Sequence, residues 1–151
     1  MTDDLDRFLE ELQRQIDEEA QSVYSDRVIQ EFSDPKHVGR LAEPDAHAIV
    51  RGGCGDTMEI YLRKDGERIT EASFMTDGCG PTVACGSLLT AMVRGLSPTE
   101  AKRISPQRLI DTLDGLPEES VHCAELAVAT LRKAIDRLLP IGDGASVQRP
   151  T

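Results

Sequence analysis

No stretch of the sequence is apolar for the roughly 20 residues that a membrane-spanning helix needs. The N-terminal sequence, MTDDLDRFLEELQRQ, also lacks the basic and apolar segments of a secretory signal. Its acidity is unlike the composition of a mitochondrial transit peptide. We therefore expect a cytoplasmic protein that has no membrane partner.

Basic residues are too few to balance the acidic ones, since 17 Lys and Arg against 27 Asp and Glu give a formal net charge of −10. We expect no nucleic-acid partner, because phosphate repels such a surface. The negative charge would either steer a basic protein partner towards the chain or only keep the chain soluble. The sequence also contains no G-x-G-x-x-G or P-loop motif, so nothing in it indicates nucleotide binding.

Cysteine is scarce as well, and no two of the four cysteines form a Cys-x₂-Cys pair. The spacings typical of zinc fingers and ferredoxins are therefore absent. In a reducing compartment these residues should be free thiols and not disulfides. Metal binding, sulfur chemistry and simple core packing all remain open for them. The four residues are Cys54, Cys79, Cys85 and Cys123.

The pattern of apolar residues predicts helices on either side of a short β region. Alternation predicts strands at 57–64 and 68–76, joined by an Asp65-Gly66 hairpin turn, and a weaker strand at 46–51. The alternation breaks near Ile69, which indicates a bulge. Helices are predicted at 4–20, 22–32, 81–95, 97–104, 105–113 and 120–139.

This order of elements is typical of an α+β fold, here a small three-stranded, mainly antiparallel sheet packed against a helical layer. At 151 residues the chain should form a single domain. We divide it into an N-terminal amphipathic helix at 1–22, a core domain at 23–139 and a disordered tail at 140–151. The N-terminal helix would dock on the core or mediate self-association, for example in a homodimer.

Three of the cysteines lie where predicted elements begin. Cys54 stands between glycines before a strand, Cys79 precedes a helix, and Cys123 falls in the first turn of the last helix if Ser120 is its cap. A helix N-terminus favours thiolate and so predicts a lowered pKa for the last two thiols. Cys85 is about 9 Å further along its helix than Cys79, so we expect it to be a packed core residue.

Two further ligand types are close to these thiols in the sequence. Asp56 is two residues from Cys54, and His122 is next to Cys123. Thiolates together with a carboxylate and an imidazole suit either an iron–sulfur cluster or Zn²⁺. From the residues alone, a functional metal or sulfur site and ordinary buried thiols remain equally good interpretations.

Three short cysteine motifs follow one another along the chain: Cys54-Gly55-Asp56, then Gly78-Cys79-Gly80, then His122-Cys123. With them and with Tyr24-Ser25-Asp26-Arg27, the chain resembles the NifU/IscU-type iron–sulfur cluster scaffold family from Tyr24 to about Leu138. The resemblance implies that Cys54, Cys79 and Cys123 are cluster ligands and sulfur acceptors. It implies that Asp56 is a labile fourth ligand or a group that tunes release of the cluster. It also implies that His122 is an alternate ligand or a neighbouring hydrogen-bond donor.

The same resemblance implies the partners of the protein. A cysteine desulfurase would supply sulfur, and a transient [2Fe-2S] or [4Fe-4S] cluster would pass to apo-proteins, so the chain would be a carrier and not an enzyme. Members that dock a dedicated chaperone carry Leu-Pro-Pro-Val-Lys before the His-Cys pair. This chain has Leu116-Pro117-Glu118-Glu119-Ser120 there, which argues against such docking.

One alternative is a zinc-bound sulfur acceptor similar to the SufU branch of the superfamily. There a single Zn²⁺ would be held by Cys54, Asp56, Cys79 and Cys123, and the protein would accept a persulfide. That branch carries a basic residue near its third cysteine, and this chain has none there, which favours the scaffold. Zinc in a purified sample would not decide, because vacant thiolate sites bind Zn²⁺ more tightly than Fe²⁺.

Overall fold

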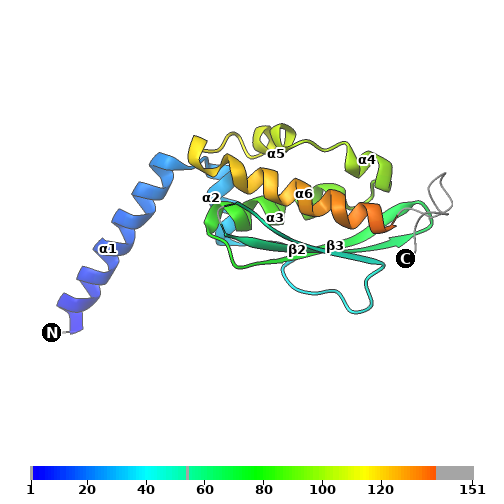
Figure 1. The fold of residues 1–151 in the computed structure, drawn as a ribbon. Helices are drawn as coiled ribbons and strands as arrows, with labels where there is room; N and C mark the ends of the chain where they lie inside the picture. The colour runs from blue at the N-terminus through cyan, green and yellow to red at the C-terminus, as the bar shows by residue number, and fades with distance from the viewer. Residues whose placement is uncertain (1, 54, 139–151) are drawn as a thin grey trace.

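The structure is a computed structural model that describes residues 2–53 and 55–138. Cys54 and the tail predicted at 140–151 lie outside the described residues. The described part is an α+β domain with three antiparallel strands and a helical layer, which confirms the predicted fold class (Figure 1). The elements are α1 Thr2–Val23, α2 Asp26–Ser33, β1 Ala46–Arg51, β2 Thr57–Asp65, β3 Arg68–Thr76, α3 Gly80–Val93, α4 Pro98–Lys102, α5 Pro106–Thr112, the 3₁₀ helix η1 Glu118–Ser120 and α6 Val121–Leu138.

The sheet has the order β1-β2-β3, and its register follows the predicted alternation. Met58, Ile60 and Leu62 of β2 are fully buried on the side that faces the helices. The predicted bulge is confirmed: Arg63 pairs with Glu71 and Lys64 pairs with Ile69, so that Thr70 has no partner in the ladder. The extra residue sits next to the hairpin turn and leaves the opposite end of the sheet regular.

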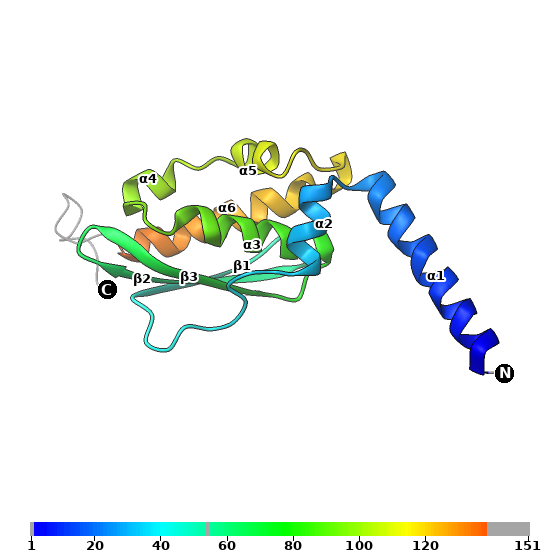
Figure 2. The same cartoon turned by 180° about the vertical axis from the view of Figure 1, so that it is seen from behind.

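Helices α3 and α6 cover one face of the sheet, and α4 and α5 lie beyond them (Figures 1 and 2). The loop at 34–45, which leads from α2 to β1, passes the sheet on the side away from α3 and α6 (Figure 2). At the outer edge of β3, Val38 of this loop forms a parallel bridge with Phe74. Helix α3 approaches β3 closely because residue 86 is glycine. A Cβ atom on Gly86 would lie 2.5 Å from the Phe74 ring.

The helix starts follow local capping rules. Ser97 and Glu100 form the capping box at α4 that the sequence predicts. Helix α2 begins at Asp26 and not at 22, because Ser25 accepts a hydrogen bond from the Val28 backbone and caps it. Ser120 is not the cap of the last helix, because it closes the 3₁₀ turn η1, which continues directly into α6.

The N-terminal helix α1 extends away from the sheet and from the other helices (Figure 2). Four apolar residues of this helix, Leu5, Phe8, Leu9 and Leu12, are between 43% and 61% accessible. Within the described residues, none of the helices combines the length and the apolar character that crossing a membrane requires.

Candidate functional site

The turn between β1 and β2 carries the first predicted site residues. The Gly52 backbone N–H donates to the Asp56 carbonyl at 2.7 Å, which closes the turn. Gly55 has a φ of +97°, a conformation that glycine adopts without strain. Asp56, which directly precedes β2, is partly buried. Cys54 belongs to this segment of the sequence but lies outside the described residues.

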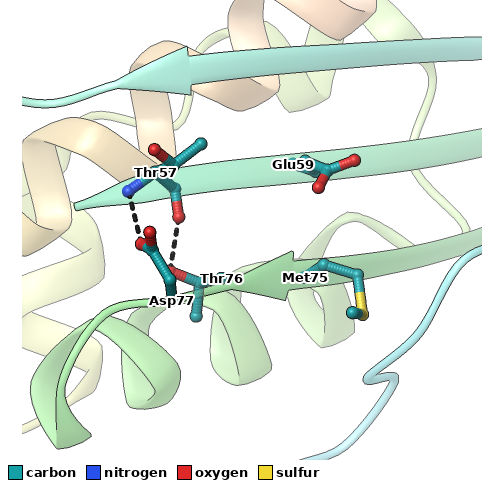
Figure 3. Close-up of a pocket in the computed structure, with 5 residues that line it drawn as sticks. All are labelled: Thr57, Glu59, Met75, Thr76 and Asp77. Carbon is teal, nitrogen blue, oxygen red and sulfur yellow. Dashed lines mark hydrogen bonds between the residues drawn. The ribbon is translucent and has the colours of Figure 1, made fainter.

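Side chains fasten the ends of β2 and β3 to each other next to this turn (Figure 3). The Asp77 carboxylate accepts a hydrogen bond from the Thr57 backbone at 2.7 Å, and the Thr76 hydroxyl donates to the Thr57 carbonyl at 2.6 Å. The Gly78 backbone in turn donates to the Thr76 hydroxyl at 3.0 Å. These bonds hold the segment after Asp56 against the segment before Cys79.

The same strand ends form a shallow depression. A pocket of about 320 Å³ is lined there by Thr57, Glu59, Met75, Thr76 and Asp77, with Glu59 and Met75 further along the strands (Figure 3). Its lining contains none of the predicted site residues. The pocket therefore borders the candidate site and is not the site itself.

Cys79 directly precedes helix α3, as the sequence predicts, and occupies its N-cap position without a side-chain capping bond. The structure shows that this thiol is exposed. Thr82, one helical turn further, is fully buried. The Cys79 sulfur lies 3.7 Å from the Thr82 hydroxyl oxygen. Helix α3 therefore presents a solvent-facing thiol and a buried hydroxyl on one side.

Helix α6 brings the second described thiol to this hydroxyl. The Thr82 Oγ1 atom lies 3.2 Å from the Cys123 sulfur and 3.1 Å from the Asp56 Oδ2 atom. Three of the predicted site residues, which are distant in the sequence, thus meet around Thr82. His122 is exposed beside them, with its Nε2 atom 3.7 Å from the Cys123 sulfur.

The electrostatics of Cys123 differ from the prediction. Burial raises the pKa of the Cys123 thiol to about 11, although the hydrogen bond from Thr82 acts in the opposite direction. The predicted lowering of this pKa by a helix N-terminus is wrong for two reasons. Cys123 is only 1% exposed, and the helical segment already begins three residues before α6, in η1. Metal binding must therefore displace a proton from this sulfur.

Cys85 is a core residue, as predicted. It is completely buried in α3, and burial raises its pKa, with the neighbouring Cys123 and Cys79 thiols acting in the same direction. A thiol that stays neutral and has no access to solvent is inert towards metals and sulfur donors. It therefore packs beneath the site.

Residues 2–53 and 55–138 contain no group of three or more Cys, His, Asp and Glu side chains arranged to hold a metal ion. The predicted ligand set includes Cys54, which is outside that range. The described members of the set are two sulfurs and one carboxylate gathered around a single hydroxyl. These donor types suit iron or zinc.

The sequence did not indicate Thr82 as a member of this group, and it indicated Gly78 only as part of the Gly78-Cys79-Gly80 motif. A Cβ atom on Gly78 would lie 2.7 Å from the Thr82 Cβ atom and 2.8 Å from the Asp56 Oδ2 atom, so only glycine leaves room for both. The signal for Thr82 was its place three residues after Cys79 in a predicted helix, which puts both on one face. The tight packing at Gly78 has no signature in the sequence.

The fold and the group of side chains around Thr82 define a class of protein: a small α+β domain that gathers thiols and a carboxylate at one end of its sheet. The family model described as the NifU-like N terminal domain matches residues 23–140. The chain is 37% identical over 114 residues to "Iron-sulfur cluster assembly scaffold protein IscU 1" of Archaeoglobus fulgidus, which covers 75% of this chain and 74% of that protein. It therefore belongs to the NifU-like N-terminal domain family.

Two further similarities agree with this assignment. The IscU scaffold protein of Haemophilus influenzae is 36% identical over 118 residues, covering 75% of this chain and 93% of that protein. The crystal structure of an N-terminal NifU-like protein from Brucella abortus matches with a TM-score of 0.62 at 23% identity, covering 77% of this chain and 94% of that one. The latter shows that the fold is shared.

Proposed function

We propose that this protein is an iron–sulfur cluster assembly scaffold, which collects sulfur and iron on Cys54, Cys79 and Cys123 and transfers the cluster to apo-proteins. The observation that carries the proposal is the meeting of Asp56, Cys79 and Cys123 around Thr82. The names of its relatives, which are cluster assembly scaffolds, support the same function. Its partners are then a cysteine desulfurase and apo-forms of iron–sulfur proteins.

The difference in exposure between the two described thiols suggests the order of sulfur delivery. Cys79 is exposed, whereas Cys123 is buried behind it. The Cys79 thiolate attacks the terminal sulfur of a persulfide on the desulfurase. The S–S bond of the donor breaks, a new S–S bond forms on Cys79, and the donor cysteine leaves as a thiolate. Such chemistry needs a reducing compartment such as the cytoplasm.

The mixed donor set suits a cargo that must later be released. Thiolates bind iron firmly, whereas a carboxylate is a harder and weaker partner for such a cluster. Asp56 as the fourth ligand, with His122 as its nearby alternate, keeps one coordination position exchangeable. A client cysteine can take that position first. The cargo is a [2Fe-2S] or [4Fe-4S] cluster.

The proposal is tested by anaerobic reconstitution with Fe²⁺, cysteine and a cysteine desulfurase, followed by addition of an apo-ferredoxin. A visible-absorbing cluster should form and move to the ferredoxin. The variants Cys54→Ser, Cys79→Ser and Cys123→Ser should lose it. Cys85→Ala is the matched control, because it removes a buried thiol of α3 outside the predicted ligand set and should keep cluster formation.

Two outcomes would contradict the scaffold. If no cluster forms but a persulfide accumulates on the zinc-loaded protein, the function is that of a sulfur acceptor. If the three serine variants handle metal and sulfur as the unchanged protein does, the thiols are structural only.

A further inference from the structure

The Thr82 hydroxyl occupies the centre of the candidate site. It is fully buried, and its oxygen is within hydrogen-bond distance of the Asp56 carboxylate at 3.1 Å and of the Cys123 sulfur at 3.2 Å. A hydroxyl group carries a single hydrogen, so it can donate to only one of these acceptors at a time. The Cys79 sulfur is a third and more distant neighbour of the same oxygen, at 3.7 Å. The geometry therefore contains a choice of hydrogen-bond acceptor, and Asp56 and Cys123 are the two nearer ones.

Other buried threonines in the described helices behave differently. Thr90 donates to the Gly86 carbonyl at 2.7 Å, and Thr130 donates to the Leu126 carbonyl at 2.7 Å, each one turn back in its own helix. That bond is the usual way in which a helix satisfies a buried threonine. Thr82 instead bonds to groups from the β1–β2 turn and from α6. Its hydroxyl serves the site and not its own helix.

The position of this hydroxyl is fixed by packing. Gly78 lies directly against Thr82, since a Cβ atom there would come within 2.8 Å of the Thr82 Cγ2 atom as well as of Asp56. A β-branched side chain in a helix has few χ1 rotamers, and this contact restricts them further. The oxygen is thereby aimed between Asp56 and Cys123.

Metal loading changes which hydrogen bond can form. While the Cys123 sulfur carries its hydrogen, it can donate to the Thr82 oxygen, and Thr82 can donate to Asp56. A metal ion takes the place of the sulfur's hydrogen. The sulfur is then an acceptor only, and the Thr82 hydrogen can turn from the carboxylate to the sulfur. In this step the S–H bond breaks, its proton passes to solvent and a metal–sulfur bond forms, while around Thr82 only the hydrogen bonds change.

We propose that Thr82 is a positioning residue that tethers Asp56 while the site is empty and hydrogen-bonds to the Cys123 sulfur once the site is loaded, which frees Asp56 to bind the metal. The inference rests on the proposed function and deepens it, because it names the group that controls the exchangeable fourth ligand. A hydrogen bond to a metal-bound sulfur also withdraws electron density from it, so Thr82 tunes the metal–sulfur bond as well.

The test uses the full chain and Co²⁺ as an optical probe of thiolate ligation. Thr82→Val keeps the shape of the side chain and removes the hydroxyl, Thr82→Ala removes the hydroxyl by a second route, and Thr82→Ser restores it. Thr90→Val is the matched control, a buried threonine of the same helix that bonds within that helix. Thermal melts check that each variant is folded.

We expect the sulfur-to-Co²⁺ charge-transfer band to move to longer wavelength in Thr82→Val and Thr82→Ala, because the sulfur regains electron density. It should stay unshifted in Thr82→Ser and Thr90→Val. In cluster transfer to an apo-ferredoxin, loss of the hydroxyl should change the rate roughly three- to tenfold. This change should become smaller when Asp56 is replaced by alanine, because only the effect of the hydroxyl on the Cys123 sulfur then remains.

The inference is overturned if Thr82→Ser shifts the band as Thr82→Val does, or if the band does not move in any Thr82 variant. Additive effects of Thr82→Val and Asp56→Ala on transfer would also overturn it. If the unchanged protein shows no thiolate-to-Co²⁺ band at all, the proposed ligand set itself fails, which distinguishes that failure from a failure of the role of Thr82.

Discussion

The Ser87 hydroxyl of α3 donates a hydrogen bond of 2.6 Å to the carboxylate of Glu31 on α2, which is 98% buried. The same carboxylate accepts from the Arg27 guanidinium at 3.0 Å and lies 3.6 Å from the Lys36 ammonium. A buried acid is thus satisfied from both sides. The Ser87–Glu31 bond joins α3, whose N-cap is Cys79, to α2.

Ser87→Ala should lower the free energy of unfolding by about 1–3 kcal/mol, because it leaves a buried carboxylate short of one donor. Urea denaturation of the apo-protein measures this change. Ser33→Ala, an exposed serine at the end of α2, should stay within about 0.5 kcal/mol. Equal effects of the two variants would mean that the Ser87–Glu31 bond adds nothing to stability.

Gly78→Ala should damage the site more than the fold. Its Cβ atom would overlap Thr82 and Asp56, and overpacking of this kind costs about 1–3 kcal/mol. We expect Co²⁺ affinity to fall by about tenfold, measured by absorbance titration.

Gly86→Ala is the matched control for that change, since it forces a Cβ atom against the Phe74 ring in the core instead. It should lower the melting temperature but keep the Co²⁺ affinity of the folded protein. Loss of affinity in both variants would show that the effect at Gly78 is not local.

Alkaline pH should destabilise the apo-protein through its buried thiols. Burial raises the pKa of Cys123 to about 11 and that of Cys85 further. The unfolded chain loses these protons near pH 8.5–9, whereas the folded chain keeps them. The stability that neutral thiols contribute is therefore complete below about pH 8.5 and declines towards pH 11, at up to about 1.4 kcal/mol per pH unit for each thiol.

Urea unfolding at pH 8, 9 and 10 with a reductant present measures this decline. Cys85→Ala removes one of the two thiols, so its loss of stability over the range should be about 1–2 kcal/mol smaller than that of the unchanged protein. Identical pH dependence in the two proteins would contradict the role of burial at Cys85.

The thiols should also differ in their reaction with iodoacetamide. Cys79 is exposed, whereas Cys123 and Cys85 are 1% and 0% accessible. Cys79 should therefore be labelled at least tenfold faster than Cys123 in the native apo-protein at neutral pH, as peptide mass spectrometry measures. Labelling in urea is the control and should make the three thiols equivalent. Native labelling of Cys123 at the rate of Cys79 would contradict the described burial.

Most of the fold follows from local sequence signals. Alternation in β2 locates the strand, the break near Ile69 locates the bulge, and Ser97 with Glu100 locates the start of α4. These features depend on neighbouring residues, so the sequence contains them directly. The start of α2 was harder to predict, because a continuous helical pattern hides the cap at Ser25.

The candidate site was predictable in part. The motifs around Asp56, Cys79 and Cys123 correctly indicated the family, which the family model and the relatives confirm. The depth of Cys123 and the central place of Thr82 were not predictable, because both depend on how α6 packs against α3. Burial raises the pKa of Cys123, whereas the sequence predicts that a helix N-terminus lowers it.

Helix α1 projects from the domain (Figure 1), and its 22 residues span about 33 Å at 1.5 Å per residue. A compact body with such an arm tumbles and diffuses more slowly than a sphere of the same mass. Elution from a gel-filtration column will therefore give an apparent mass above the true one. Sedimentation equilibrium or light scattering, which do not depend on shape, is the sound way to count subunits of this protein.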